Sequence, residues 1–156
     1  MKEGLIEQLK SQEYFFLNSV SCFAEADSSF KPKDEMFTVA QQVAHVTDTY
    51  DWFLEGAFGD KGYDMNFEGY EEKMKKFTSF ENEVQRFKDA IARSIERVKS
   101  LPEAELMAPI TGEVMKGAPK MAAIGACADH TAHHRGALTV YARLLGKVPK
   151  MPYGEM

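Results

Sequence analysis

The spacing of apolar residues constrains the fold of this chain more than any other feature. In four segments apolar side chains recur at three- and four-residue intervals, and no segment sustains an alternation of period two. The first spacing keeps apolar side chains on one face of an α-helix, whereas alternation is typical of a β-strand. The pattern predicts an all-α fold, and 156 residues suit a single domain, residues 1–156.

Capping and breaking residues locate the first two predicted helices. The first spans residues 3–26. The second spans residues 39–57 and begins after Thr38, whose hydroxyl forms a capping box with Gln41. Glycines then break it, and a long connection that ends at residue 77 is expected to contain a short helical piece.

Similar signals locate the other two predicted helices. The third begins with a capping box of Thr78 and Glu81 and is stopped by Pro102. The fourth spans residues 119–145, with a proline at its start and Gly146 after its end. Four amphipathic helices of this kind form an antiparallel four-helix bundle, whose core is a common place for metal sites.

Charge and composition argue against nucleic acids and membranes as partners. The net charge is -5, and the densest basic stretch, residues 73–76, directly follows two glutamates, so we expect no nucleic-acid partner. The N-terminus lacks an apolar signal core and the longest uncharged small-apolar run, residues 121–128, is too short to span a bilayer. We therefore expect no membrane association and a cytoplasmic protein, with Cys22 and Cys127 as reduced core thiols.

The four histidines are confined to the second and fourth predicted helices. His130 and His134 are four residues apart, so they lie one turn apart on the same helix face. His133 lies at the edge of that face and is the weaker ligand candidate. The face is otherwise mostly apolar and contains Ala123, Cys127, Ala137, Leu138, Tyr141 and Leu145. The two imidazoles could form a metal chelate, or they could be buried rings that hydrogen bonds satisfy.

His45 lies on a polar but uncharged face of the second predicted helix. The aliphatic stripe and the charged stripe of that helix lie elsewhere, and His45 shares its face with Thr38, Gln42, Thr49, Trp52 and Gly56. Such a face suits either a pocket lining or a dimer interface. We expect Thr49 and Trp52, with Cys127 and Tyr141 of the fourth helix, to line a pocket, although each could serve only in packing.

Three neutral imidazoles around one ion would leave a coordination position open, as in catalytic metal sites. Zinc and nickel are the metals we expect, and iron would also accept such ligands. The protease motif H-E-x-x-H requires a glutamate directly after its first histidine, and Thr131 stands there. The sequence therefore disfavours a metalloprotease.

The segment DHTAHHRG at residues 129–136, followed by YARLLG at residues 141–146, resembles the last helix of DinB-type proteins. Residues 38–53, with His45 near their middle, resemble the second helix of the same family. This is the damage-inducible bundle family, which is distinct from the DNA polymerase that shares its name. The resemblance covers nearly the whole chain in order and spacing.

The resemblance implies an antiparallel bundle of unusual helix order, with a metal site between helices two and four. The positions that match its ligands are His45, His130 and His134. Because many relatives are homodimers, we expect this protein to be a homodimer as well. Characterised relatives include thiol-dependent S-transferases, a mycothiol-dependent isomerase and proposed metal-dependent hydrolases.

Two functions are compatible with such a site. The first is a metal-dependent enzyme, a thiol S-transferase or a hydrolase, in which the ion activates a low-molecular-weight thiol or a water molecule toward a small-molecule substrate. The second is a non-catalytic stress or structural protein in which the ion only joins two helices. The open coordination position favours the enzyme. No carboxylate is placed as a general base beside the histidines, because Asp48 and Asp129 fall on other faces.

Overall fold

The computed structural model describes residues 1–154. Residues 155 and 156, which the expected single domain includes, lie outside the described residues. No β-strand occurs in the described part of the chain, so the predicted all-α class is confirmed. The elements in chain order are α1 (Lys2–Val20), the 3-10 helix η1 (Glu25–Asp27), α2 (Val39–Phe58), α3 (Tyr70–Met74), α4 (Phe80–Ser100), α5 (Glu103–Met107) and α6 (Ala122–Leu144).

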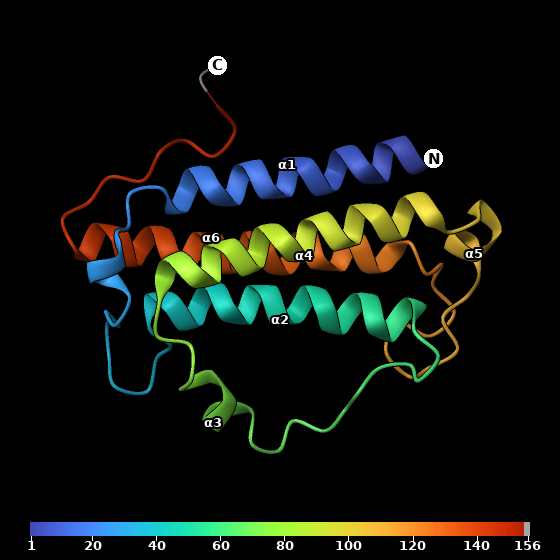
Figure 1. Cartoon of the computed structure of the whole chain (residues 1–156), viewed down its shortest axis with the longest axis horizontal. Helices are drawn as coiled ribbons and strands as arrows, with labels where there is room; N and C mark the ends of the chain where they lie inside the picture. The colour runs from blue at the N-terminus through green and yellow to red at the C-terminus, as the bar shows by residue number, and fades with distance from the viewer. Residues whose placement is uncertain (155–156) are drawn as a thin grey trace.

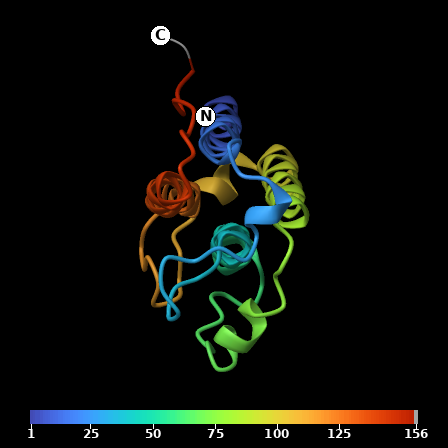
Figure 2. The ribbon, with the colours of Figure 1, turned by 90° about the vertical axis from the view of Figure 1, so that its left-hand side faces the viewer.

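The four long helices lie side by side, and an end view places them at the corners of a square (Figures 1 and 2). Helix α2 packs against α4 and α6, and α1 packs against the same two helices. The colour gradient in Figure 1 shows that α1 and α6 run in one direction and α2 and α4 in the other. The neighbouring pairs α2–α6 and α1–α4 are therefore antiparallel.

The other two neighbouring pairs, α2–α4 and α1–α6, are parallel, so an antiparallel arrangement throughout was a wrong expectation. The long connection through α3 explains the difference. It leads the chain from the end of α2 back to the level of its start, where α4 begins (Figure 1). A short loop would have forced α4 to run antiparallel to α2.

The core lies between these helices and is formed by the apolar stripes that the spacing predicts. On α4 this stripe includes Phe87, Ile91 and Val98, each at most 1% exposed. Phe87 packs against Phe16 of α1 and Tyr50 of α2, with ring centroids 4.4 and 5.8 Å apart. None of the described helices combines the length and the apolar character needed to cross a bilayer.

The capping box at the start of α2 is confirmed. The backbone N–H of Gln41 donates to the hydroxyl of Thr38 at 3.2 Å, and the backbone N–H of Thr38 donates to the side-chain oxygen of Gln41 at 2.9 Å. These two bonds pair N–H groups that a helix start would otherwise leave free. The start of α2, and with it the position of His45 two turns later, is thereby fixed.

Other helix ends differ from the predictions. Helix α1 stops at Val20, and part of the remaining predicted segment forms η1. Helix α4 is capped by Ser79, which accepts from the N–H of Asn82, and not by Thr78. The reason is tertiary, because the N–H of Glu81 donates to a carboxylate oxygen of Glu25 from η1. Helix α6 begins at Ala122, since the preceding chain forms an isolated bridge between Pro109 and Pro119.

Candidate metal centre

The three predicted histidines converge between α2 and α6. The Nε2 atom of His130 lies 3.1 Å from Nε2 of His45 and 3.1 Å from Nε2 of His134. One ligand atom from each residue lies within 4.8 Å of the other two, and the three side chains are half-buried. His133, the weaker candidate, is exposed and outside this group.

The spacing of the nitrogens suits a common cation. Two imidazole nitrogens bound to one tetrahedral zinc ion at 2.0–2.1 Å are about 3.3 Å apart. The observed 3.1 Å separations are close to that value. Little movement of the rings would therefore be needed to bind an ion.

Hydrogen bonds among the described residues do not satisfy every nitrogen of the three rings. Each neutral imidazole nitrogen either donates or accepts, so the Nε2 of His130 cannot serve as both toward its two neighbours. The Nδ1 of His130 is buried and has no partner among the described residues. Buried polar atoms normally have partners, and a central cation would accept lone pairs from all three Nε2 atoms. The donor set fits a metal ion better than it fits a packed histidine cluster.

The outer nitrogens of the other two rings are held by side chains. Nδ1 of His134 lies 2.6 Å from the side-chain oxygen of Gln42, and Nδ1 of His45 lies 2.5 Å from the hydroxyl of Tyr70 on α3. When an imidazole binds through Nε2, its Nδ1–H needs such an acceptor. These contacts orient two of the three rings toward the centre.

Burial keeps the three imidazoles neutral. Desolvation, with the neighbouring histidines, lowers the pKa of His130 to about 4 and that of His134 to about 3. Desolvation also lowers the pKa of His45 from its ordinary value. A neutral imidazole has the free lone pair that a metal ion requires. At neutral pH the rings are therefore ready to bind without releasing protons.

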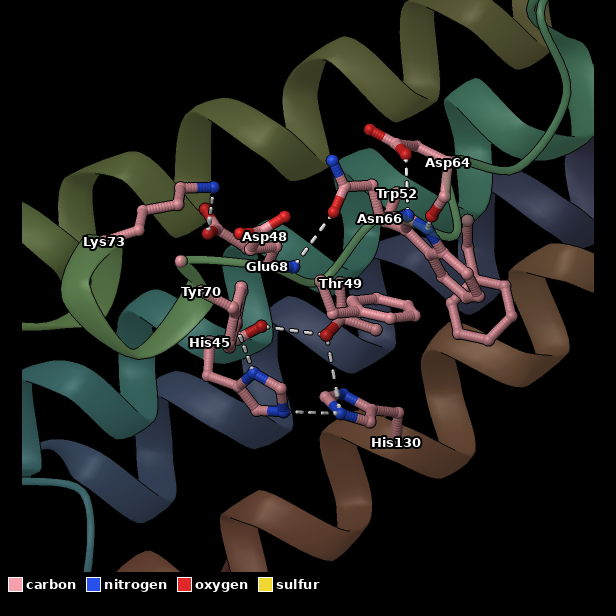
Figure 3. A pocket seen from close by; sticks show the side chains of 13 residues that line it. His45, Asp48, Thr49, Trp52, Asp64, Asn66, Glu68, Tyr70, Lys73 and His130 are labelled. Carbon is pink, nitrogen blue, oxygen red and sulfur yellow. Dashed lines mark hydrogen bonds and ion pairs between the residues drawn. The ribbon is translucent and has the colours of Figure 1, made fainter.

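A cavity of about 590 Å³ opens beside the histidines, between α2 and the connection that leads to α4 (Figure 3). His45 and His130 contribute to its lining, and His134 does not. Aromatic rings form much of the wall, namely Trp52, Phe53, Phe67 and Tyr70. The face of α2 that suited either a pocket or a dimer interface thus borders this cavity.

The connection is held against α2 by Trp52 and Tyr63. The indole N–H of Trp52 donates to the backbone oxygen of Asp64 at 2.6 Å. The ring of Tyr63 packs against Trp52 at 4.8 Å between centroids and lies over Gly56. A Cβ atom at Gly56 would lie 2.3 Å from this ring, so only glycine lets Tyr63 pack so closely.

Two of the four predicted pocket residues line the cavity and two do not. Thr49 and Trp52 are part of its wall. Cys127 is 1% exposed in the core, where burial raises the pKa of its thiol to about 12, so it is not a nucleophile at neutral pH. Tyr141 is also 1% exposed and lies in the core. Both residues share a helix face with His130, but that face continues into the bundle beyond the cavity.

Two of the charged groups that line the cavity, Asp48 and Lys73, are paired with each other. Asp48 lines the cavity, contrary to the expectation that it falls on another face. Its carboxylate is bound by Lys73 at 2.5 Å and by Arg86 at 2.9 Å. It is therefore not free to serve as a general base. Asp129 is exposed and does not line the cavity, as its place on the helix wheel indicated.

Sequence reasoning missed the roles of Gln42 and Tyr70. Gln42 shares the uncharged polar face with His45, and that position was a signal which could have identified it. Tyr70 belongs to the long connection, where no periodic pattern relates it to His45. Only the folded path of the connection brings the two together, with the Tyr70 hydroxyl on Nδ1 of His45.

Comparisons with known proteins agree with this architecture. The chain matches the family model described as the DinB superfamily over residues 8–138. Its structure is similar to the crystal structure of a DinB-like protein from Bacillus subtilis, with a TM-score of 0.70 and 16% sequence identity. That similarity covers 98% of this chain and 99% of the other. No significant match was found among curated proteins. The family match spans most of the chain, and the chain therefore belongs to the DinB superfamily.

Proposed function

We propose that His45, His130 and His134 hold a divalent metal ion and that the protein is a metal-dependent enzyme. The observation that carries this proposal is the convergence of three Nε2 atoms, with separations of 3.1 Å from His130 to each of the other two. Zinc or nickel is the metal we expect, and iron is a further candidate, since imidazole nitrogens bind all three. Such an ion would lower the pKa of a bound thiol or water and make it a nucleophile at neutral pH.

The cavity supports an enzyme over a purely structural metal site. A metal that only joined α2 to α6 would need no open space beside it, and structural sites are normally closed by a fourth protein ligand. Here His45 and His130 border a cavity of about 590 Å³, which is in the range of small-molecule sites. A substrate in this cavity would lie next to two of the three ligands.

The lining indicates the chemical character of the substrate. The walls formed by Trp52, Phe53 and Phe67 suit an apolar or aromatic group and would exclude water from it. Among the described residues that line the cavity, Lys73 is the only lysine or arginine. Its ammonium group forms an ion pair with Asp48. Asp64 and Glu68 also line the cavity. The site therefore favours uncharged or cationic molecules over anionic ones.

Thiol S-transfer is the reaction we favour, and hydrolysis is the second candidate. Hydrolysis is helped by a carboxylate that takes a proton from water. Asp48, the lining carboxylate on the helix that carries His45, is engaged by Lys73 and Arg86, and the other two, Asp64 and Glu68, belong to the connection. A thiol has a lower pKa than water, so it loses its proton without such a base more easily. The substrate would be a small electrophile together with a low-molecular-weight thiol. The alternative is a metal-binding stress or structural protein without turnover.

Elemental analysis of the purified protein and a thiol-consumption assay test the proposal. We expect about one equivalent of zinc or nickel per chain, and loss of that metal in His134→Ala. His133→Ala is the matched control, since His133 is the adjacent exposed histidine. The metal-loaded protein should consume thiol with an electrophilic reporter faster than His134→Ala does. Equal rates would contradict S-transfer, and equal metal contents would contradict the site itself.

A further inference from the structure

A chain of three hydrogen bonds leads from the backbone to the ligand His134. The hydroxyl of Tyr141 donates to the backbone oxygen of Phe37 at 3.0 Å. The side-chain amide nitrogen of Gln42 donates to the hydroxyl of Tyr141 at 3.3 Å. The amide oxygen of Gln42 lies 2.6 Å from Nδ1 of His134. Gln42 is 7% exposed and Tyr141 is 1% exposed, so solvent has little access to these groups.

The donors and acceptors of these three hydrogen bonds can be assigned in one way only. A backbone carbonyl oxygen cannot donate, so Tyr141 must use its single hydroxyl proton toward Phe37. Toward Gln42 the phenol oxygen can then only accept, which requires the NH₂ end of the Gln42 amide on that side. The oxygen end of the amide consequently faces His134, and an amide oxygen also only accepts. Nδ1 of His134 must therefore carry the proton.

We infer that Gln42 and Tyr141 are positioning residues that fix His134 in the tautomer with a bare Nε2. A neutral imidazole carries one N–H, so a proton on Nδ1 leaves the lone pair on Nε2. That lone pair faces the Nε2 of His130, 3.1 Å away, and would be free to bind an ion. The inference deepens the proposed metal site and depends on it for its purpose. The proton assignment itself depends only on the hydrogen bonds.

The arrangement also explains why Tyr141 is buried away from the cavity. Its hydroxyl contributes nothing to the lining, but it prevents the Gln42 amide from turning over. A reversed amide would place NH₂ against Nδ1 of His134 and move the ring proton to Nε2, where it would block metal binding. The series of hydrogen bonds ends at the backbone oxygen of Phe37, just before the start of α2, which can only accept.

Zinc affinity in three variants tests the inference, measured by competition with a chromophoric chelator. Gln42→Leu removes the acceptor and should weaken binding about 10- to 100-fold, the usual effect of losing a partner of a ligand histidine. Gln42→Glu keeps an acceptor and should bind within about threefold of the parent. Tyr141→Phe should weaken binding by less than Gln42→Leu, because the amide stays but can rotate. Thr47→Val is the matched control, since Thr47 is buried on the same helix and bonds only the backbone oxygen of Val43.

A second measurement needs no metal. In the ¹⁵N-labelled metal-free protein, long-range ¹H–¹⁵N correlations should show Nδ1 of His134 protonated, and Gln42→Leu should shift the proton toward Nε2. A parent protein with Nε2 of His134 protonated would overturn the inference. Gln42→Leu binding zinc within twofold of the parent would also overturn it, as would Gln42→Glu binding as weakly as Gln42→Leu. Protonated Nδ1 in a protein that binds no metal would uphold the tautomer while refuting the proposed function. If Gln42→Leu fails to fold, the zinc affinity of Tyr141→Phe and the ¹H–¹⁵N spectrum of the parent protein test the inference instead.

Discussion

Replacing His130 with alanine should change stability in opposite directions with and without metal. In the metal-free protein the Nδ1 of His130 is buried without a partner among residues 1–154, and its Nε2 faces two other nitrogens at 3.1 Å. An unpaired buried polar group costs about 1–3 kcal/mol, and the half-buried ring places this one near the lower value. At about 2–4 °C per kcal/mol for a chain of this length, His130→Ala should raise the metal-free Tm by about 2–4 °C.

With zinc the sign reverses. At a free zinc concentration about 100-fold above Kd, binding stabilises the parent by about 2.7 kcal/mol, which raises its Tm by about 5–10 °C. His130→Ala keeps one ligand on each helix and should lose most of this gain. Differential scanning calorimetry in chelator and in zinc buffer measures both effects, and His133→Ala should behave as the parent does. A zinc-induced shift in His130→Ala equal to that of the parent, or a metal-free Tm several degrees lower, would refute the reasoning.

Three further predictions concern pH, substrate charge and helix capping. Burial lowers the pKa of His130 to about 4 and that of His134 to about 3, so below pH 6.5 the unfolded chain binds more protons than the folded one. The free energy of unfolding of the metal-free protein should therefore fall as pH decreases from 7 toward 4. Urea titrations should show a shallower fall in His134→Ala, and a pH dependence identical to that of the parent would contradict this assignment. The cobalt-loaded protein should bind cysteamine and 2-mercaptoethanol more tightly than mercaptoacetate, as followed by its absorption spectrum, and preference for the anionic thiol would contradict the charge argument. Ser79→Ala should destabilise the protein by about 1 kcal/mol in chemical denaturation, whereas Thr78→Ala should change little, and a larger effect of Thr78→Ala would contradict the observed cap.

The features that could be predicted from the sequence are those set by local periodicity. The four-residue spacing of His130 and His134 places both on one helix face, and the Thr38 and Gln41 capping box fixes the start of α2. Convergence of His45 with that pair followed from its separate polar face and from the family resemblance. Homodimer formation and a cytoplasmic location stay predictions.

The features that could not be predicted depend on contacts between distant segments. Thr78 and Ser79 are both suitable caps, and the contact between Glu25 and the N–H of Glu81 accompanies the choice of Ser79. The parallel course of α2 and α4 depends on the path of the long connection, which carries no periodic signal. Tyr70 reaches His45 through that same path. A helical wheel shows which face of a helix a residue lies on but not its position along the helix axis. It therefore could not distinguish the residues that line the cavity from Cys127 and Tyr141, which lie in the core.

The long connection between α2 and α4 has a consequence for how this protein could diversify. It returns the chain along the bundle, and the same residues form the outer wall of the cavity, with Trp52 and Tyr63 holding them in place. The histidines, in contrast, are carried by α2 and α6, which belong to the packed core. Insertions or substitutions in residues 59–69 would therefore reshape that outer wall and leave the helices that carry the histidines unchanged. Under the proposed function, the outer wall of the cavity could change in sequence without changing the three histidines, whereas its inner wall, with Thr49 and Trp52, shares α2 with His45.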